Sequence, residues 1–213
     1  MKEALKETKF LDFNNPEMNA FIKEFTPLKS DKEKAIAVYE KVRDHFLYDP
    51  FHLDLRPNVL KASVILSKNR AWCVEKAIVM AAALRSLNIP SKLGYGIVVN
   101  HIGVDKLLKY LKRPEIVFHG YVSVYLDGQW VKATPAFDPL VCRLSKVEIL
   151  SWDGEKDAMF QEFQNGEKFM EYKHFYGEFE DVPVDLMNRE MEKYYPHLFQ
   201  VKHDTKQFSF FHM

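Results

Sequence analysis

The sequence predicts an α+β fold in which a buried helix packs against an antiparallel sheet. Two patterns lead to this prediction. Apolar residues recur at helical spacing over residues 73–87, and residues 118–133 alternate around Asp127-Gly128 as in a β-hairpin. The chain has 213 residues, of which 47% are hydrophobic, enough for one well-buried core. We therefore expect one domain with extensions.

Further helices and one more strand are predicted before and after the buried helix. Residues 32–47 repeat apolar side chains at helical spacing, and Asp31 can cap their start. Shorter helices are expected over 59–67 and 104–112. Residues 92–99 are expected to form a strand that a glycine pair bends or bulges.

The chain is expected to divide into a core and two extensions. Residues 1–30 mix charge with prolines and predict an extended lead-in with one short helix. Residues 31–145 hold the patterned core. Residues 146–213 contain aromatic and acidic clusters without a long periodic run, which predicts an irregular layer packed on the core. A single domain over the whole length is the alternative.

Composition and charge argue against several classes of partner. Lys+Arg and Asp+Glu number 30 each, so no net field attracts nucleic acid. The longest apolar run, 77–84, is far shorter than the ~20 residues that cross a bilayer. The N-terminus lacks the apolar segment of a secretory signal. We expect a soluble cytoplasmic protein with neither a nucleic-acid nor a membrane partner, and the oligomeric state stays open.

Cysteine and histidine spacing predicts neither a metal nor a cofactor. Cys73 and Cys142, without a secretory signal, are expected to stay thiols. The eight histidines occur without HExxH, CxxC or a calcium-loop pattern. A metal-dependent enzyme using His119, His101 and Cys73 would lack any supporting spacing.

Cys73 stands at the predicted N-terminal end of the buried helix. Unpaired N–H groups and the helix dipole favour negative charge there, so we expect a thiol pKa below its usual ~8.5. The same N–H groups can receive an oxyanion when a carbonyl is attacked. Taken alone, an isolated cysteine is more often a small buried hydrophobe.

His119 is the candidate base for that thiol. A histidine beside a cysteine can take its proton and later protonate the leaving group. With a two-residue turn, Leu126 faces Gln129, so His119 is expected to face Ala136 on the neighbouring strand. An ordinary strand histidine is the alternative.

Two side chains on the neighbouring strand are candidates to orient the imidazole. Thr134 and Asp138 lie diagonally from His119 on the same face of the predicted hairpin. Asp138 carries the charge that would stabilise an imidazolium. Because Asp138 precedes Pro139, an ordinary turn aspartate is an equally good interpretation.

Three segments together resemble the transglutaminase-like family. They are Trp72-Cys73 at the start of an alanine-rich helix, Leu-Arg-Ser-Leu-Asn-Ile-Pro at 84–90, and FHGYVSVYLDGQWV at 118–131. In that family the cysteine begins a helix, an R-x-x-x-I-P segment ends it, and the histidine lies on a strand before a W-v-x-x-D-P-T element. The resemblance spans roughly residues 35–140 and implies a papain-like Cys-His-Asp core.

One position departs from the family pattern. The family's aspartate falls on Thr134, so D-P-T has become Thr-Pro-Ala. The segment resembles a bacterial subgroup in which an Asn or Asp follows four residues later, here Asp138, with Thr134 as a neutral substitute. Trp72 beside the cysteine would then wall the acyl site or contribute to the oxyanion hole, or it is a packed aromatic.

The expected function is acyl transfer through a cysteine. Cys73 would attack an amide or thioester carbonyl, His119 would carry the proton, and Asp138 would orient His119. Water would give hydrolysis of a peptide or other amide bond, whereas an amine would give transamidation. The expected partner is therefore a peptide, protein or small amide substrate. The alternative is a non-catalytic binding module with the same fold, motivated by the missing aspartate at position 134.

Overall fold

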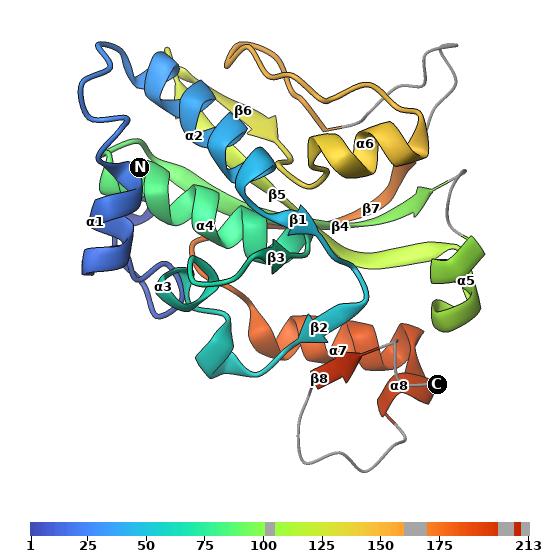
Figure 1. Cartoon of the computed structure of the whole chain (residues 1–213). Helices are drawn as coiled ribbons and strands as arrows, with labels where there is room; N and C mark the ends of the chain where they lie inside the picture. Colours follow the sequence, from blue (N-terminus) through green and yellow to red (C-terminus); the bar gives the residue numbers. More distant parts are fainter. Residues whose placement is uncertain (101–104, 160–169, 200–206, 210–213) are drawn as a thin grey trace.

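A four-stranded antiparallel sheet with the strand order β6-β5-β4-β7 forms the centre of the structure (Figure 1). The structure is a computed structural model that describes residues 1–100, 105–159, 170–199 and 207–209. The four strands are β4 (Ser91–Asn100), β5 (Glu115–Leu126), β6 (Gln129–Ala133) and β7 (Met170–Phe179). Helices pack on this sheet, so the predicted α+β class is confirmed.

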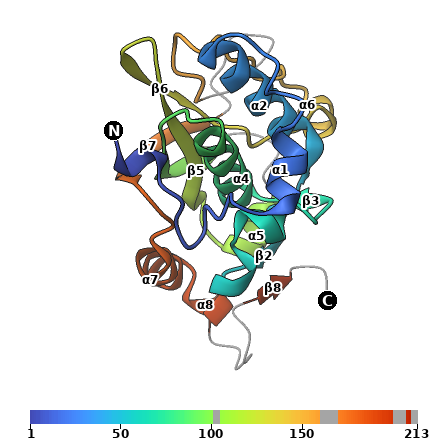
Figure 2. The same ribbon diagram turned by 90° about the vertical axis from the view of Figure 1, so that its left-hand side faces the viewer.

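Helix α4 (Cys73–Ser86) lies against β5 and β4, and α2 (Asp31–His45) packs on the other side of α4 (Figures 1 and 2). The shorter α1 (Pro16–Ile22) and α3 (Ala62–Ile65) also contact α4, while α7 (Val184–Tyr194) packs on β5. The remaining elements are η1 (Glu3–Leu5), β1 (Leu47–Tyr48), β2 (His52–Asp54), η2 (Pro57–Val59), β3 (Arg70–Ala71), α5 (Asp105–Leu111), α6 (Pro139–Ser145), α8 (Pro196–Phe199) and β8 (Gln207–Ser209).

Helix α4 is buried on every side, as its alanine-rich sequence predicts. All of its residues from Cys73 to Arg85 are buried, because the sheet covers one face and the other helices cover the rest. The helix ends where Asn88 adopts a left-handed φ of +61° and Ile89 N–H bonds to the Leu84 carbonyl at 2.9 Å. Pro90 then prevents further helix.

The predicted hairpin register is confirmed over the paired strands. Leu126 faces Gln129, and the pairing continues to Val122 opposite Ala133. Asp127 and Gly128 both have positive φ, as a two-residue turn of this type requires. Strand β6 stops at Ala133, and the N–H of the next residue, Thr134, donates to the Ala158 carbonyl at 3.0 Å.

Two local expectations were wrong. Ser30 rather than Asp31 caps α2, and its side chain accepts from Glu33 N–H at 3.1 Å in a capping box. The C-terminal extension is not irregular, because β7 is a ten-residue edge strand on β4 and α7 is an eleven-residue helix. Strand β7 lacks apolar alternation, since much of it is exposed, so its sequence gives no strand signal.

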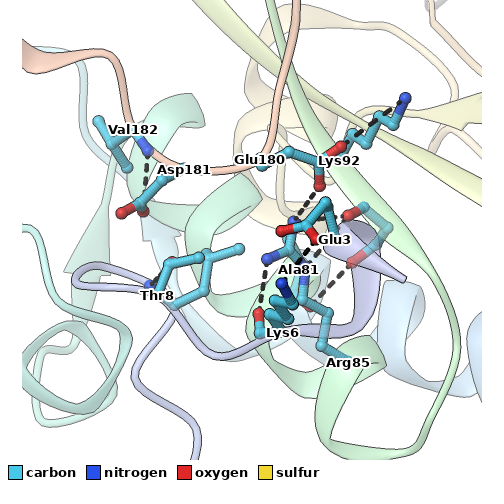
Figure 3. Close-up of polar contacts among 11 residues, drawn as sticks. Glu3, Lys6, Thr8, Ala81, Arg85, Lys92, Glu180, Asp181 and Val182 are labelled. Carbon is cyan, nitrogen blue, oxygen red and sulfur yellow. Dashed lines mark hydrogen bonds and ion pairs between the residues drawn. The ribbon is translucent and has the colours of Figure 1, made fainter. Parts of the chain in front are cut away.

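Arg85, from the segment that ends α4, joins four parts of the chain (Figure 3). Its guanidinium donates to the Ser91 carbonyl at 2.8 and 3.1 Å and to the Lys6 carbonyl at 2.7 Å. It also forms an ion pair with Glu180 at 3.2 Å. A buried guanidinium needs such acceptors, and here they fix the end of α4 to the N-terminal segment and to the end of β7.

Lys76 is a fully buried lysine in the first turns of α4. Its ammonium donates to the Arg43 carbonyl on α2 at 2.9 Å. Burial lowers the pKa of Lys76 to about 7, although the nearby carboxylates of Asp138 and Asp44 oppose this shift. The contact therefore ties α4 to α2 at an electrostatic cost.

Gly120 brings β5 against the first turn of α4. A Cβ at this position would lie 3.0 Å from the Cys73 carbonyl oxygen and 3.1 Å from Val74 Cα. Both are backbone atoms of a packed helix, so neither can move aside alone. Any side chain at position 120 would therefore require the strand or the helix to shift.

No helix among the described residues is both long and apolar enough to cross a membrane.

Replacing Gly120 with alanine is expected to destabilise the protein by about 1–3 kcal/mol, because the added methyl group would force α4 away from β5. Urea denaturation would measure the change in the free energy of unfolding. Ser123→Ala on the same strand is the control, since it removes a buried hydroxyl that has no partner among the described residues. Equal stability of the two variants would contradict the packing constraint.

Lys76→Met is expected to change how stability depends on pH. The folded pKa of Lys76, about 7, lies below the ordinary 10.5, so between these values the unfolded chain holds a proton that the folded protein has released. Wild-type stability, taken relative to the variant, should therefore rise with pH by up to about 1.4 kcal/mol per pH unit. Urea denaturation at several pH values would test this, and parallel profiles for the two proteins would contradict it.

Candidate active site

The candidate nucleophile, Cys73, is the first residue of α4 and lies two positions after β3. The Glu75 carboxylate accepts a hydrogen bond from Trp72 N–H at 3.3 Å, which closes the first turn of the helix. Lys68 forms an ion pair with the same carboxylate. Cys73 is only 2% exposed, so its thiol is enclosed where the unpaired N–H groups of the helix converge.

Burial dominates the ionisation of this thiol. It raises the pKa of Cys73 to about 11, although the nearby N–H groups of Gly120, Val74 and Cys73 and the hydroxyl of Tyr48 favour the thiolate. The lowered pKa expected from the helix N-terminus is therefore wrong for this closed arrangement. The donors that would stabilise negative charge are nevertheless present around the sulfur.

His119 lies on β5 directly after a β-bulge. Gly96 on β4 faces His119 and Val98 faces Ile116, so β5 carries one extra residue between these two pairs. Phe118 within the bulge has a φ of +62°, a strained conformation for a bulky residue. The bulge sets the direction of the imidazole that follows it.

The imidazole of His119 has one partnered and one unpartnered nitrogen. Nδ1 lies 2.9 Å from the Tyr172 hydroxyl. Nε2 is buried and has no hydrogen-bond partner among the described residues, so no hydrogen bond joins it to Cys73. Burial lowers the pKa of His119 to about 4. Both the thiol and the imidazole are therefore uncharged at neutral pH.

Asp138 makes its hydrogen bonds away from His119. One carboxylate oxygen accepts from the N–H groups of Leu140 and Val141 at 2.8 and 3.2 Å, which caps α6. The other accepts from Tyr48 N–H at 2.6 Å. The carboxylate thus joins α6 to β1, the strand whose tyrosine hydroxyl reaches the candidate nucleophile. Its predicted role in orienting His119 has no hydrogen bond to support it.

Thr134 lies just beyond the end of β6. Its hydroxyl donates to the Gly120 carbonyl at 3.0 Å, and its N–H donates to the Ala158 carbonyl at the same distance. Thr134 therefore holds the carbonyl of Gly120, the residue after His119, and makes no hydrogen bond to the ring itself.

Tyr172 on β7 is the neighbour of His119 that the sequence did not predict. A tyrosine in an aromatic-rich segment is most often a packing residue, so the sequence around Tyr172 does not indicate a contact with His119. The only signal is structural, because Gly96 has no side chain at the point of β4 that faces His119.

A small cavity of about 30 Å³ lies beside Cys73. A cavity of this volume is large enough to hold a water molecule. Its walls are apolar and aromatic, without a charged side chain among the described lining residues, and include Trp72, Leu107, Ile116 and Met191. The cavity suits an uncharged group next to the thiol.

The C-terminal part of the chain supplies one wall of this cavity. Tyr195, after α7, donates from its hydroxyl to the Glu115 carbonyl at 2.6 Å and accepts from Val117 N–H at 2.9 Å. These bonds anchor the segment to the start of β5 and hold Met191 against the cavity.

Trp72 lines the cavity next to the thiol. Its indole is 4% exposed, and Nε1 has no hydrogen-bond partner among the described residues. A buried donor without a partner costs free energy unless a ligand satisfies it. The predicted contribution of Trp72 to an oxyanion site remains compatible with this position.

Two further residues considered in the sequence analysis are Cys142 and His101. Cys73 and Cys142 are both buried thiols. His101 lies outside the described residues. Over the parts of the chain that the structure describes, no three side chains of the His, Cys, Asp and Glu types come together as a metal site would need.

Comparison with known proteins agrees with the site at the level of the family. The model of the transglutaminase-like superfamily matches residues 19–135, more than half of the chain. That match includes both Cys73 and His119 and ends before Asp138 and Tyr172.

One solved structure with a similar chain is that of "a Putative Cysteine Protease from Cytophaga hutchinsonii". The TM-score is 0.49 and the identity 19%, and the match covers 65% of this chain and 43% of the other. This chain therefore spans less than half of that protein. No curated protein matches the chain. The match over residues 19–135 shows that the chain belongs to the transglutaminase-like superfamily, and this membership supports a cysteine-dependent enzyme at the family level.

Proposed function

We propose that this protein is a cysteine-dependent acyl-transfer enzyme in which Cys73 is the nucleophile and His119 the base. One observation carries the proposal. The Cys73 thiol lies at the start of a buried helix, among backbone N–H donors, and the donor that comes from the sheet belongs to Gly120, the residue after His119. A nucleophile, a base and donors for an oxyanion therefore lie within one small region.

In the first step, Nε2 of His119 takes the thiol proton while Sγ attacks the carbonyl carbon of the substrate. The carbonyl electrons move to oxygen, and this oxyanion accepts hydrogen bonds from the N–H groups around Cys73. Trp72 Nε1–H is a further candidate donor, because it has no other partner among the described residues.

In the second step, the tetrahedral intermediate expels its leaving group, which takes the proton from His119. An acyl group is then held on Cys73 as a thioester. Water attacks this thioester to release a carboxylic acid, or an amine attacks it to give a new amide, and either route regenerates the thiol. A peptide, protein or other small amide is the proposed substrate class.

A non-catalytic binding module is the second candidate. The neutral, buried state of Cys73 and His119 favours it, and so does the threonine at position 134. A module of this kind would bind its ligand without forming a bond to sulfur, so trapping an acyl-enzyme separates the two proposals.

An acyl-enzyme is expected when the protein is mixed with p-nitrophenyl acetate at neutral pH. Intact mass and peptide mapping should place one acetyl group on Cys73 in the wild type. Cys73→Ala should lose it, and His119→Asn should slow its formation by about 10²- to 10⁴-fold, because the thiol then lacks its base.

Cys142→Ala is the matched control, since this second buried thiol lies outside the proposed chemistry. It should acylate at the wild-type rate. Acetylation that persists in Cys73→Ala, or that never reaches Cys73 in folded wild type, would support the binding module instead.

The cavity is expected to restrict the length of the acyl group. Because about 30 Å³ is available beside the thiol, p-nitrophenyl acetate should acylate Cys73 faster than the hexanoate ester. Met191→Ala removes part of the wall and should raise the hexanoate-to-acetate rate ratio by roughly tenfold or more. Met187→Ala, on the same helix but away from the cavity, is the control. An unchanged ratio in Met191→Ala would show that the acyl group lies elsewhere.

A further inference from the structure

The Nδ1 atom of His119 has a partner that comes from outside the family-matched part of the chain. Tyr172 belongs to β7, the edge strand that pairs with β4. Its hydroxyl lies 2.9 Å from His119 Nδ1, and the two rings meet edge to face with centroids 5.8 Å apart. The distance between Nδ1 and the hydroxyl oxygen is that of a hydrogen bond.

Gly96 makes this contact possible. It faces His119 across β4 and β5, and a Cβ there would lie 2.6 Å from Cδ1 of Tyr172. A side chain at position 96 would therefore push the tyrosine ring away from β4, the strand that lies between β7 and β5. Because Gly96 has no side chain, Tyr172 on β7 can lie across β4 and contact His119 on β5, two strands away.

The ring of Tyr172 is held in place from two further sides. Phe175 stacks on it with centroids 4.8 Å apart and an interplanar angle of 8°. Tyr121 meets it at 90° with centroids 6.1 Å apart. A packed aromatic ring loses little freedom when its hydroxyl forms a hydrogen bond, so the geometry is preorganised.

The two side chains predicted to orient the imidazole are engaged elsewhere. Three backbone N–H groups occupy the Asp138 carboxylate, and the Thr134 hydroxyl donates to the Gly120 carbonyl. Tyr172 is therefore the side chain that contacts Nδ1 by a hydrogen bond within the described residues.

We propose that Tyr172 is the positioning residue of His119, accepting a hydrogen bond from Nδ1–H and thereby keeping the lone pair on Nε2 for the Cys73 proton. This inference rests on the proposed function and deepens it. It assigns to a neutral hydroxyl the place that a carboxylate takes in a Cys-His-Asp arrangement.

A neutral partner changes how the base operates. A carboxylate would stabilise the imidazolium by charge, whereas a phenol oxygen fixes the tautomer and offers only a dipole. The resting state then consists of a thiol and a neutral imidazole, in keeping with the lowered pKa of His119 and the raised pKa of Cys73. Proton transfer must accompany the attack on the carbonyl, because no ion pair exists beforehand.

Tyr172→Phe tests the inference, with Tyr121→Phe as the matched control. Both variants remove one hydroxyl from the same aromatic group, but only Tyr172 bonds to His119. Nitrogen-15 NMR of the histidine side chains should show His119 protonated at Nδ1 in the wild type and in Tyr121→Phe. That preference should be lost in Tyr172→Phe, and acetylation of Cys73 should slow by about 10- to 100-fold.

The possible outcomes separate this inference from the proposed function. If Tyr172→Phe keeps both the wild-type tautomer and the wild-type acylation rate, Tyr172 is a packing residue and the inference is overturned, while Cys73 acylation still stands. If wild-type Cys73 never acylates, the proposed function fails, although NMR would still report the bond to Nδ1. Slowing without a tautomer change would also overturn the inference, since a general loss of packing would explain it.

Discussion

The contact between the first turn of α4 and Gly120 of β5 is the constraint on which the rest of the structure depends. A Cβ added at Gly120 would lie 3.0 Å from the Cys73 carbonyl oxygen and 3.1 Å from Val74 Cα, so a larger side chain would not fit between helix and strand without a shift of one of them. One consequence is that Cys73 and His119, which lie on either side of this contact, cannot separate without breaking the core. Another is that the strand N–H of Gly120 joins the helix N–H groups around the sulfur.

Much of this arrangement was predictable from the sequence, because it depends on local patterns. The alanine-rich run predicts a helix buried on all sides, and the Asp127-Gly128 turn predicts the hairpin and its register. The pKa of Cys73 was not predictable in this way. The helix N-terminus favours the thiolate, but burial has the larger effect, and the depth of burial depends on distant segments such as α7.

The neighbours of His119 show why register alone does not determine a site. Extending the hairpin ladder places Thr134 and Asp138 near the ring, but the ladder ends at Ala133, and Thr134 N–H donates to the Ala158 carbonyl instead of continuing it. Asp138 then caps α6, for which its side chain is well suited. The position of Tyr172 depends on the pairing of two strands that are seventy or more residues apart in the sequence, and on the absence of a side chain at Gly96. No periodic pattern in the sequence indicates such a pairing.

Strand β7 also supplies the last side chain of the candidate site in chain order. The ribosome releases residues in order, so the Cys73 helix and the hairpin are complete while the edge strand has still to emerge. A nascent chain at that stage has its thiol and imidazole but neither the hydroxyl at Nδ1 nor the cavity wall from α7. By the proposal above, acylation of Cys73 would then reach its full rate only after β7 and α7 have been added to the chain.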